Sequence, residues 1–307
     1  MSFLERLKNT NDVLTHYAPL HTLLADWGKD LESHLSEWIV NHPKEYQEAL
    51  SRSFEAGCDL AYTATQASSP WRAEVFGLRD RVYEFNYKSA KLAKEVTPKG
   101  CYLMGLVSTT NPDFLEPLGS MTPQEVYEGY KLQVSGLLEG GVDIILVAGN
   151  HLEEGVIAIQ VTRDLAKVPI IAQNIFYWGK KGFRTMMGLD PGAASARLEE
   201  AGADVIGGSC GLMKKADEAI GYYQRATLLV KEMRQGCHQP LSIQPDAGLA
   251  QLIDGKTIYP ATPDEMGREV SNWIKEGARV VGGCCGTSLK HYEKISAVVR
   301  KRRSHGH

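Results

Sequence analysis

The segment Glu139-Gly-Gly-Val-Asp-Ile144 shows the pattern that decides the fold, and three further copies of it occur along the chain. In each copy a stretch with helical spacing ends in an acidic residue, a glycine follows, and an apolar run begins. Glycine just after a helix is the usual C-terminal cap, and a short β-branched run is typical of a strand buried on both faces. Each copy therefore predicts a junction from a helix to a strand. The other copies are Glu55-Ala-Gly-Cys-Asp-Leu60, Glu200-Ala-Gly-Ala-Asp-Val205 and Glu276-Gly-Ala-Arg-Val-Val281.

Apolar runs of this kind give eight candidate strands, at residues 12–15, 59–64, 102–108, 143–148, 169–174, 204–209, 241–245 and 279–283. The segments between them have helical spacing, and the one over residues 122–138 opens with Thr122-Pro-Gln-Glu125, which matches a capping box. Strand and helix alternating in this way predict an α/β fold, a single (β/α)8 TIM barrel over residues 1–307. A doubly wound open sheet is the alternative, but no Gly-x-Gly-x-x-Gly fingerprint follows the first strand.

The composition is that of a soluble globular enzyme. The chain has 307 residues, 43% of them hydrophobic and 23% charged, and a formal net charge of -3. Its basic residues are dispersed except at Arg300 to Arg303, which argues against nucleic acid as a partner. No apolar run reaches the roughly 18 residues that a membrane helix needs, so we expect no membrane partner and a cytoplasmic location. The six cysteines are too sparse for a disulfide framework.

Half of these cysteines directly follow predicted strands. Cys210 lies in Gly207-Gly-Ser-Cys-Gly211, at the end of the sixth strand, and Cys284 and Cys285 lie in Gly282-Gly-Cys-Cys-Gly-Thr287, at the end of the eighth. The carboxyl ends of barrel strands share one rim, so we expect the three thiols to meet there. The flanking glycines allow close backbone approach and positive φ. The remaining cysteines are interpreted as small buried hydrophobic residues: Cys58, Cys101 and Cys237.

Three thiols at one rim predict a zinc site. Thiolates suit Zn²⁺, and a catalytic zinc keeps three protein ligands with the fourth position free. Zinc deprotonates an incoming thiol at neutral pH and keeps its sulfur nucleophilic, so such a site suits attack on an electrophilic methyl group. Cys210, Cys284 and Cys285 are thus predicted as metal ligands and catalytic residues. The alternative is a buried cysteine pair or a vicinal disulfide with Cys210 unrelated, but the glycine framing and strand-end placement favour the metal.

The motif Gly282-Gly-Cys-Cys-Gly-Thr287, with a single upstream cysteine in a glycine-rich strand end, resembles the homocysteine S-methyltransferase family. The resemblance covers most of the chain, and this motif is highly specific. It implies a zinc-dependent methyltransferase of methionine biosynthesis whose ligands are Cys210, Cys284 and Cys285. The supporting stretches are Asn41-His-Pro43, Ala64-Thr-Gln-Ala-Ser68, Leu138-Glu-Gly-Gly-Val-Asp143, Pro245-Asp-Ala-Gly-Leu249 and Thr262-Pro-Asp-Glu-Met266.

The acceptor positions depart from the family pattern. Family members usually carry acids at the end of the first strand and a glutamate at the end of the fourth, which bind the amino group of homocysteine. This chain has Leu14-Thr-His-Tyr-Ala-Pro-Leu-His21 and Leu146-Val-Ala-Gly-Asn150 there, without an acid. A partly buried ammonium group is costly without a countercharge, so the acceptor is expected to be homocysteine or a non-canonical thiol. The residues predicted to line its site are Thr15, His16, Ala148 and Asn150.

Other polar side chains are candidates to replace the missing acids. Asp246 stands where the family generally has asparagine and, with Glu153, can supply negative charge. The histidines near strand ends are candidates for a polar lining: His16, His21 and His151. Asp246 is included among the predicted substrate-binding residues.

Aromatic residues near strand ends are candidates to bind the methyl donor. Ring faces attract sulfonium and quaternary ammonium groups at roughly 0.5–2 kcal/mol per contact. This matches the onium donors that part of the family uses. The residues predicted for this role are Tyr62, Trp71 and Phe176.

Together these features favour methyl transfer from an onium or corrinoid donor to a zinc-bound thiol. The expected partners are a small-molecule thiol acceptor, a methyl donor and, in one alternative, a corrinoid protein for which the zinc site demethylates a donor. A second alternative is a non-catalytic zinc- or thiol-binding homologue. The chain is expected to be a monomer or a homodimer.

Overall fold

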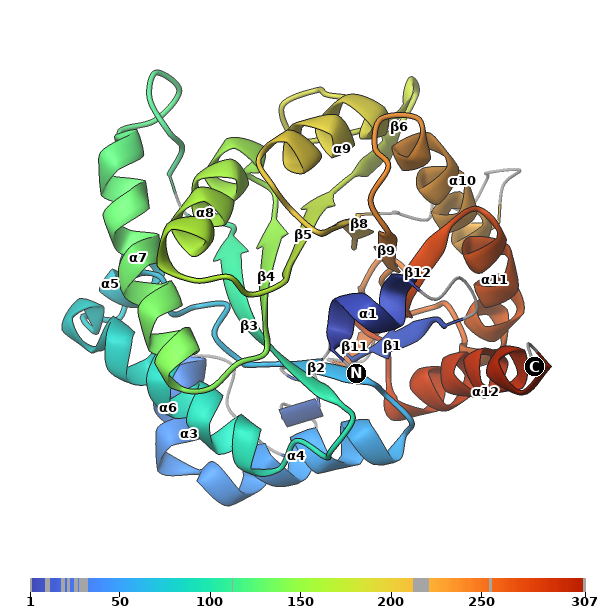
Figure 1. Ribbon diagram of the computed structural model, residues 1–307, viewed down its shortest axis with the longest axis horizontal. Coiled ribbons are helices and arrows are strands. Elements are labelled where there is room, and N and C mark those ends of the chain that lie inside the picture. The colour runs from blue at the N-terminus through green and yellow to red at the C-terminus, as the bar shows by residue number, and fades with distance from the viewer. Residues whose placement is uncertain are drawn as a thin grey trace.

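The computed structural model describes residues 2–8, 12–17, 20, 23–24, 27, 33–111, 113–211, 221–253 and 256–305. Eight parallel strands form a closed barrel, and Figure 1 shows helices surrounding it. This confirms the predicted (β/α)8 barrel, and every predicted strand overlaps an observed one. In spatial order the strands are β1 (Leu14–His16), β12 (Ala278–Gly282), β9 (Leu241–Gln244), β8 (Val205–Ser209), β5 (Ile170–Ile175), β4 (Ile144–Gly149), β3 (Tyr102–Thr109) and β2 (Leu60–Tyr62).

Helices pack outside the barrel, apart from the N-terminal α1. They are α1 (Phe3–Lys8), α3 (Leu35–Asn41), α4 (Pro43–Glu55), α5 (Pro70–Glu74), the short η1 (Arg79–Arg81), α6 (Val82–Glu95), α7 (Pro123–Glu139), α8 (Leu152–Leu165), α9 (Pro191–Glu200), α10 (Tyr222–Arg234), α11 (Pro263–Lys275) and α12 (Leu289–His305). Within the described part of the chain, no helix has both the length and the apolar character needed to cross a membrane.

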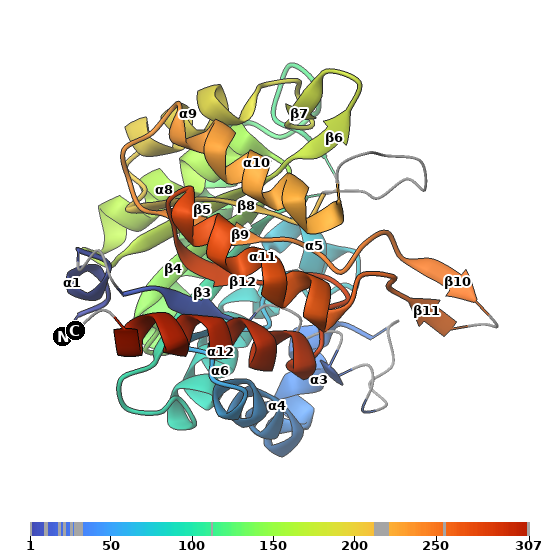
Figure 2. The ribbon, with the colours of Figure 1, turned by 90° about the vertical axis from the view of Figure 1, so that its right-hand side faces the viewer.

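Two antiparallel hairpins, which the sequence patterns did not predict, follow β5 and β9. The first pairs β6 (Tyr177–Gly179) with β7 (Gly182–Arg184), and the second pairs β10 (Gln251–Ile253) with β11 (Lys256–Ile258). Figure 2 shows the second hairpin projecting from the end of the barrel opposite α1. Both hairpins therefore belong to the rim at the carboxyl ends of the strands.

The four repeat copies form helix-to-strand junctions, as predicted. Gly57, Gly141, Gly202 and Gly277 follow helices and have φ angles of 95°, 95°, 100° and 115°. This left-handed region is unfavourable for a residue with a Cβ, which explains why glycine recurs there.

The interior of the barrel is filled by the alternate side chains that point inward from the strands. A buried cluster joins strand residues such as Leu14, Met104 and Val280 with Phe3 and Leu7 of α1. Helix α1 thus closes the amino-terminal end of the barrel with apolar side chains. A second, larger cluster fills the layer between the strands and the surrounding helices. The opposite rim, at the carboxyl ends of the strands, is where barrels of this type carry their sites.

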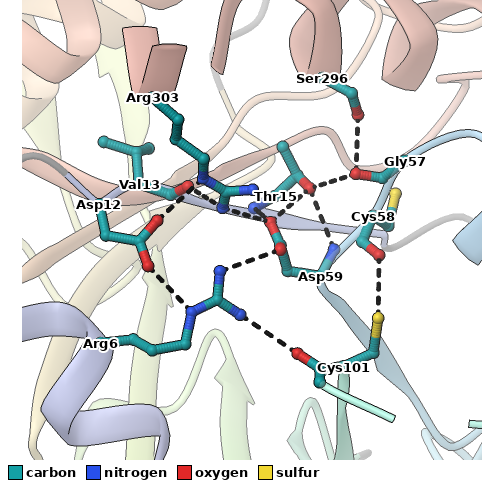
Figure 3. A network of polar contacts seen from close by, with 11 residues as sticks. Arg6, Asp12, Val13, Thr15, Gly57, Cys58, Asp59, Cys101, Ser296 and Arg303 are labelled. Atoms are coloured by element: carbon teal, nitrogen blue, oxygen red, sulfur yellow. Dashed lines mark hydrogen bonds and ion pairs between the residues drawn. The ribbon is translucent and has the colours of Figure 1, made fainter. Parts of the chain in front are cut away.

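An ionic network fastens α1 and α12 to the closed end of the barrel (Figure 3). The carboxylate of Asp59, just before β2, forms ion pairs with Arg6 at 3.2 Å and with Arg303 at 2.9 Å. The same two arginines each contact Asp12 at 2.9 Å. The backbone N–H of Thr15 also donates to Asp59, at 2.9 Å. The first and last helices are therefore held together through shared carboxylates.

We expect Asp59→Asn to lower the free energy of unfolding by about 2 kcal/mol, because it leaves two arginines short of a countercharge in a largely buried position. The Asp59 side chain is only 13% exposed. Glu48→Gln is the matched control, since Glu48 pairs with Arg52 at 2.7 Å but is 57% exposed, and its loss should cost about 0.5 kcal/mol or less. Urea unfolding of both variants measures the difference. Equal losses would show that the network adds nothing beyond a surface ion pair.

Candidate metal centre

Three cysteines gather at the open rim of the barrel. Cys210 follows β8, and Cys284 and Cys285 follow β12 after a single glycine. The Sγ atoms of Cys210 and Cys285 are 3.6 Å apart, and those of Cys284 and Cys285 are 4.0 Å apart. All three Sγ atoms lie within 4.8 Å of one another. Ligands at ~2.3 Å from a tetrahedral ion are about 3.8 Å apart, so the spacing fits one metal ion with three sulfur ligands.

The loop after β9 holds both cysteine segments in place. The backbone N–H of Cys210 donates to the carbonyl of Gln244 at 3.0 Å, and that of Cys284 donates to the carbonyl of Pro245 at 2.8 Å. Ala247 N–H in turn donates to the carbonyl of Cys285 at 2.8 Å. Cys210 has a φ of 50°, a conformation that is rare for a residue with a side chain. These contacts fix the direction of the thiols before any ligand binds.

The glycines around the cysteines are required by close packing. A Cβ on Gly286, whose φ is +76°, would lie 2.1 Å from the Tyr259 ring. A Cβ on Gly283 would lie 2.6 Å from the side chain of Thr287, and one on Gly211 would lie 2.3 Å from a backbone oxygen. Each contact is shorter than real side chains allow, so the glycine framing recognised in the sequence has a steric cause.

Two of the three thiols, those of Cys284 and Cys210, resist ionisation. The pKa of Cys284 lies well above its ordinary value because it hydrogen-bonds with Cys210 and Cys285 and because it is buried. The pKa of Cys210 is also well above the ordinary value, since its bond with Cys285 and its burial outweigh the lowering effect of Cys284. Neighbouring thiolates repel one another, and a bound dication would supply the missing countercharge. Soft sulfur ligands with mutual repulsion suit such an ion.

His16 and Tyr62, both predicted as substrate-binding residues, lie beside this centre. His16 ends β1 and stands opposite Gly282 of β12. Its ring is fully buried and meets Tyr62 edge-on, with 5.9 Å between the ring centres. Burial lowers the pKa of His16 to about 3, so the ring is neutral. The pKa of Tyr62 is raised by burial and then by the charges of Cys284 and Cys285, which places its hydroxyl in the field of the thiols.

Asp246 and Tyr259 also border the thiols. Burial raises the pKa of Asp246 to about 7, against the opposing effect of hydrogen bonds from the backbone N–H groups of Gly248 and Gly211. Tyr259, which the sequence analysis did not identify, has its pKa raised by burial and by Cys285 and Asp246. Its signal in the sequence was indirect, because Gly286 has to be glycine to make room for the Tyr259 ring.

Asn150 and Ala148 lie at the end of β4, as predicted. The Asn150 Oδ1 accepts a hydrogen bond of 2.7 Å from Tyr177 OH, and the pKa of Tyr177 is raised by burial and by Cys210. Asn150 therefore reaches the centre through Tyr177 of the first hairpin. Ala148 is partly buried against the cluster inside the barrel.

Comparison with known proteins assigns the chain to a family. The family model for homocysteine S-methyltransferase matches residues 12–299. The chain belongs to the homocysteine S-methyltransferase family. It is 27% identical over 276 residues to a methionine synthase of Mycobacterium tuberculosis (strain ATCC 25618 / H37Rv), covering 85% of this chain and 22% of the relative. A methionine synthase of Mycobacterium leprae (strain TN) is 27% identical over 263 residues, covering 81% and 21%. The chain spans about a fifth of the length of these relatives.

Solved structures with the same fold include members of this family. The metallated form of the homocysteine methyltransferase MmuM from Escherichia coli superposes with a TM-score of 0.73 at 18% identity, covering 93% of this chain and 96% of that one. The carboxyl transferase domain of Rhizobium etli pyruvate carboxylase has a TM-score of 0.53 at 13% identity, covering 97% and 50%. At these identities the likeness shows the shared fold alone.

Three residues predicted to contact substrate have side chains that pack against other parts of the barrel wall. Thr15 points out of the barrel, where its hydroxyl donates to the carbonyl of Gly57 at 2.8 Å in the network of Figure 3. Trp71 packs on α7. Its ring lies so close to Gly129 that a Cβ there would be 2.6 Å from the ring. Phe176 is 1% exposed and belongs to the layer between the strands and helices. The outward contacts of Thr15 do not agree with its predicted role in substrate binding, whereas the roles of Trp71 and Phe176 stay predictions.

The candidates for replacing the family's acids are also separated by the structure. Glu153 is exposed and forms an ion pair with Arg197 at 3.0 Å, on the surface between α8 and α9. His151 is buried and contacts Glu154, and its ring stacks on Phe114. His21 lies outside the described residues. Of the two predicted acids, Asp246 is therefore the one beside the thiols.

Proposed function

We propose that the chain is a zinc-dependent S-methyltransferase that transfers a methyl group from an onium or corrinoid donor to a zinc-bound thiol, either homocysteine or a different thiol. Residues 1–307 would act as one zinc-binding barrel domain, in the cytoplasm, as a monomer or homodimer. The observation that carries the proposal is the set of three free thiols of Cys210, Cys284 and Cys285, within 4.8 Å of one another at the open rim. Membership of the homocysteine S-methyltransferase family supports the same reaction.

The residues present fit a catalytic zinc ion. Cys210, Cys284 and Cys285 would hold it, and when bound it lowers the pKa of an incoming thiol and keeps the sulfur nucleophilic at neutral pH. The loop after β9 fixes the cysteine backbones, and α1 seals the far end of the barrel. No general base is needed in the chain, so its own residues have to position the acceptor and donor in line and exclude water.

Aromatic rings at the rim support an onium donor. The pKa values of Tyr62, Tyr177 and Tyr259 are raised by burial and then by cysteine charges, so all three hydroxyls lie near the thiols. A sulfonium or quaternary ammonium group approaching the sulfurs would meet these rings, with about 0.5–2 kcal/mol of attraction per face. This is the role that the sequence analysis gave to Trp71 and Phe176 as well as to Tyr62.

A second feature favours a donor carried by a protein, as in the corrinoid alternative. Large apolar side chains are exposed in three segments that follow strands at the open rim. They are Leu118 at 67%, Met187 at 53% and Leu252 at 79% exposure. Exposed apolar side chains on segments of the same rim are available for contact with a protein partner. We therefore propose, as the second candidate function, that the zinc site demethylates a donor for a corrinoid protein.

A methyl-transfer screen tests the proposal. Protein loaded with zinc and protein stripped by a chelator would be incubated with homocysteine or simple thiols and with sulfonium, betaine or methylcorrinoid donors, and the methylated thiol measured by mass spectrometry. We expect methylated thiol only with the zinc-loaded protein, because the thiol needs the metal to ionise. Equal turnover by the stripped protein would refute the zinc mechanism. Consumption of an onium donor only when a corrinoid is supplied would select the second function.

A further inference from the structure

One buried hydrogen-bond donor beside the metal centre has no protein partner. His16 Nδ1 faces Nε2 of Gln244, whose amide N–H donates to it. With the amide nitrogen of Gln244 assigned to face Nδ1, the neutral imidazole is assigned the tautomer that carries its proton on Nε2. His16 Nε2 is buried and, among the described residues, has no hydrogen-bond partner. The side chain of His16 thus presents an N–H group with nothing to donate to.

Buried polar groups of this kind are rare, because leaving a donor unpaired forfeits the hydrogen bond that water would have made. Where such a group persists next to a functional site, a ligand is the natural partner. The neighbours of His16 do not compete for the role: Gln173 and Ser242, which also point into the barrel, bond to each other at 2.8 Å. The free donor is therefore available to a bound molecule.

The position of His16 connects this donor to the thiols. The backbone carbonyl of Gln244 accepts the N–H of Cys210, so the side chain that orients His16 belongs to the residue that anchors a metal ligand. His16 pairs with Gly282, two residues before Cys284, and its ring contacts Tyr62. His16 is fully buried, whereas Cys285 is exposed, so His16 lies deeper in the barrel than the sulfur cluster. A thiol held at the cysteines would extend its other end towards this depth.

We propose that His16 determines acceptor specificity by donating a hydrogen bond from Nε2–H to a carbonyl oxygen, of a carboxylate or an amide, on the acceptor thiol. The inference builds on the proposed thiol methyltransferase function and names the acceptor class: a thiol with a carbonyl group a few bonds from sulfur. A donor N–H matches an oxygen and repels an ammonium group, which agrees with the absence of acids at the ends of β1 and β4. His16 is thus a specificity residue, separate from the metal ligands.

Cobalt-substituted protein provides a test that does not require a methyl donor. A thiol that joins Co²⁺ gives a sulfur-to-cobalt charge-transfer band, whose titration yields a dissociation constant. Three thiols of equal length would be compared: 4-mercaptobutyrate, 4-mercaptobutyramide and 1-butanethiol. We expect the two carbonyl-bearing thiols to bind wild-type protein at least tenfold more tightly than 1-butanethiol. Tighter binding of the carboxylate than of the amide, or the reverse, identifies which carbonyl the site prefers.

Variants separate hydrogen bonding from packing. His16→Phe keeps an aromatic ring against Tyr62 but removes the N–H donor. The dissociation constants of the three thiols should then lie within about twofold of one another. His16→Gln retains an N–H donor and should keep the preference. His34→Phe is the control for loss of a buried histidine elsewhere, since His34 packs on Phe85 in the helical layer. Cobalt content and the thermal midpoint report whether each variant is folded.

The outcomes distinguish this inference from the function on which it builds. Equal binding of all three thiols by wild-type protein would overturn the role of His16 without any variant, and so would an unchanged preference in folded His16→Phe. In both cases thiol binding at the metal would still support the proposed function. If no thiol perturbs the cobalt spectrum, the thiol acceptor itself is refuted, and the role of His16 with it.

Discussion

Cys285→Ala protein should be purified with almost no zinc, whereas the wild type should carry about one ion per chain. Structural zinc sites bind the ion with about 10–16 kcal/mol, and removing one of only three thiolates from this site takes away a third of its protein ligands. The fold should survive, because Cys285 is exposed and lies beyond the end of β12. Elemental analysis of dialysed protein gives the metal content, and circular dichroism verifies the fold.

Cysteines outside the cluster provide matched controls. Cys58 and Cys237 are buried free thiols that contact backbone carbonyls or apolar neighbours. Cys237→Ala should lose stability through the cavity it leaves but keep its zinc. If single alanine variants of Cys210, Cys284 and Cys285 all retain full zinc, the metal assignment is wrong.

A thiol without an α-amino group should be used at least as well as homocysteine. The ends of β1 and β4 offer His16, Ala148 and Asn150, none of which can neutralise an ammonium group, so homocysteine would have to bury its charge unpaired. The measurement compares kcat/KM for 4-mercaptobutyrate and homocysteine with one methyl donor. A hundredfold preference for homocysteine, about 2.7 kcal/mol, would contradict this expectation.

The Asp246→Asn variant tests whether Asp246 is the source of any preference for homocysteine. Asp246 already accepts hydrogen bonds from the backbone N–H groups of Gly248 and Gly211, and it is the predicted acid that lies near the thiols. We expect the substitution to change the ratio of kcat/KM for 4-mercaptobutyrate to that for homocysteine by no more than about threefold. If wild type favours homocysteine and Asp246→Asn abolishes the preference, Asp246 has taken over the role of the missing family acids.

The sequence predicted the barrel well because its signals are local. A glycine after a helix and a short apolar run recur at four of the junctions, and the φ values of Gly57, Gly141, Gly202 and Gly277 show that the backbone depends on these glycines. The cysteine cluster followed from the same logic. Once two strands belong to the same parallel barrel, residues just after their carboxyl ends must share a rim, even when another strand lies between them, as β9 lies between β8 and β12.

Residues lining the centre were harder to predict because their direction depends on tertiary structure. β1 spans only Leu14–His16, so no alternating pattern shows which neighbour faces inward. Thr15 points outward to Asp59, and His16 points inward to Gln244. Tyr177 begins β6 of the first hairpin and Tyr259 follows β11 of the second, and these strands are too short to show a periodicity. Trp71 and Phe176 are aromatic residues near predicted strand ends, as Tyr62 is, but their side chains pack against helices.

The closure of the barrel also has a consequence for how the protein is made. The first strand pairs with the last, Leu14 opposite Val280, and Arg303 ties the final helix back to Asp12. Contacts this far apart in sequence cannot form until the ribosome has released the segments that contain Val280 and Arg303. Cys210 emerges earlier and must wait for Cys284 and Cys285. The metal centre is therefore among the last parts of the barrel to be assembled.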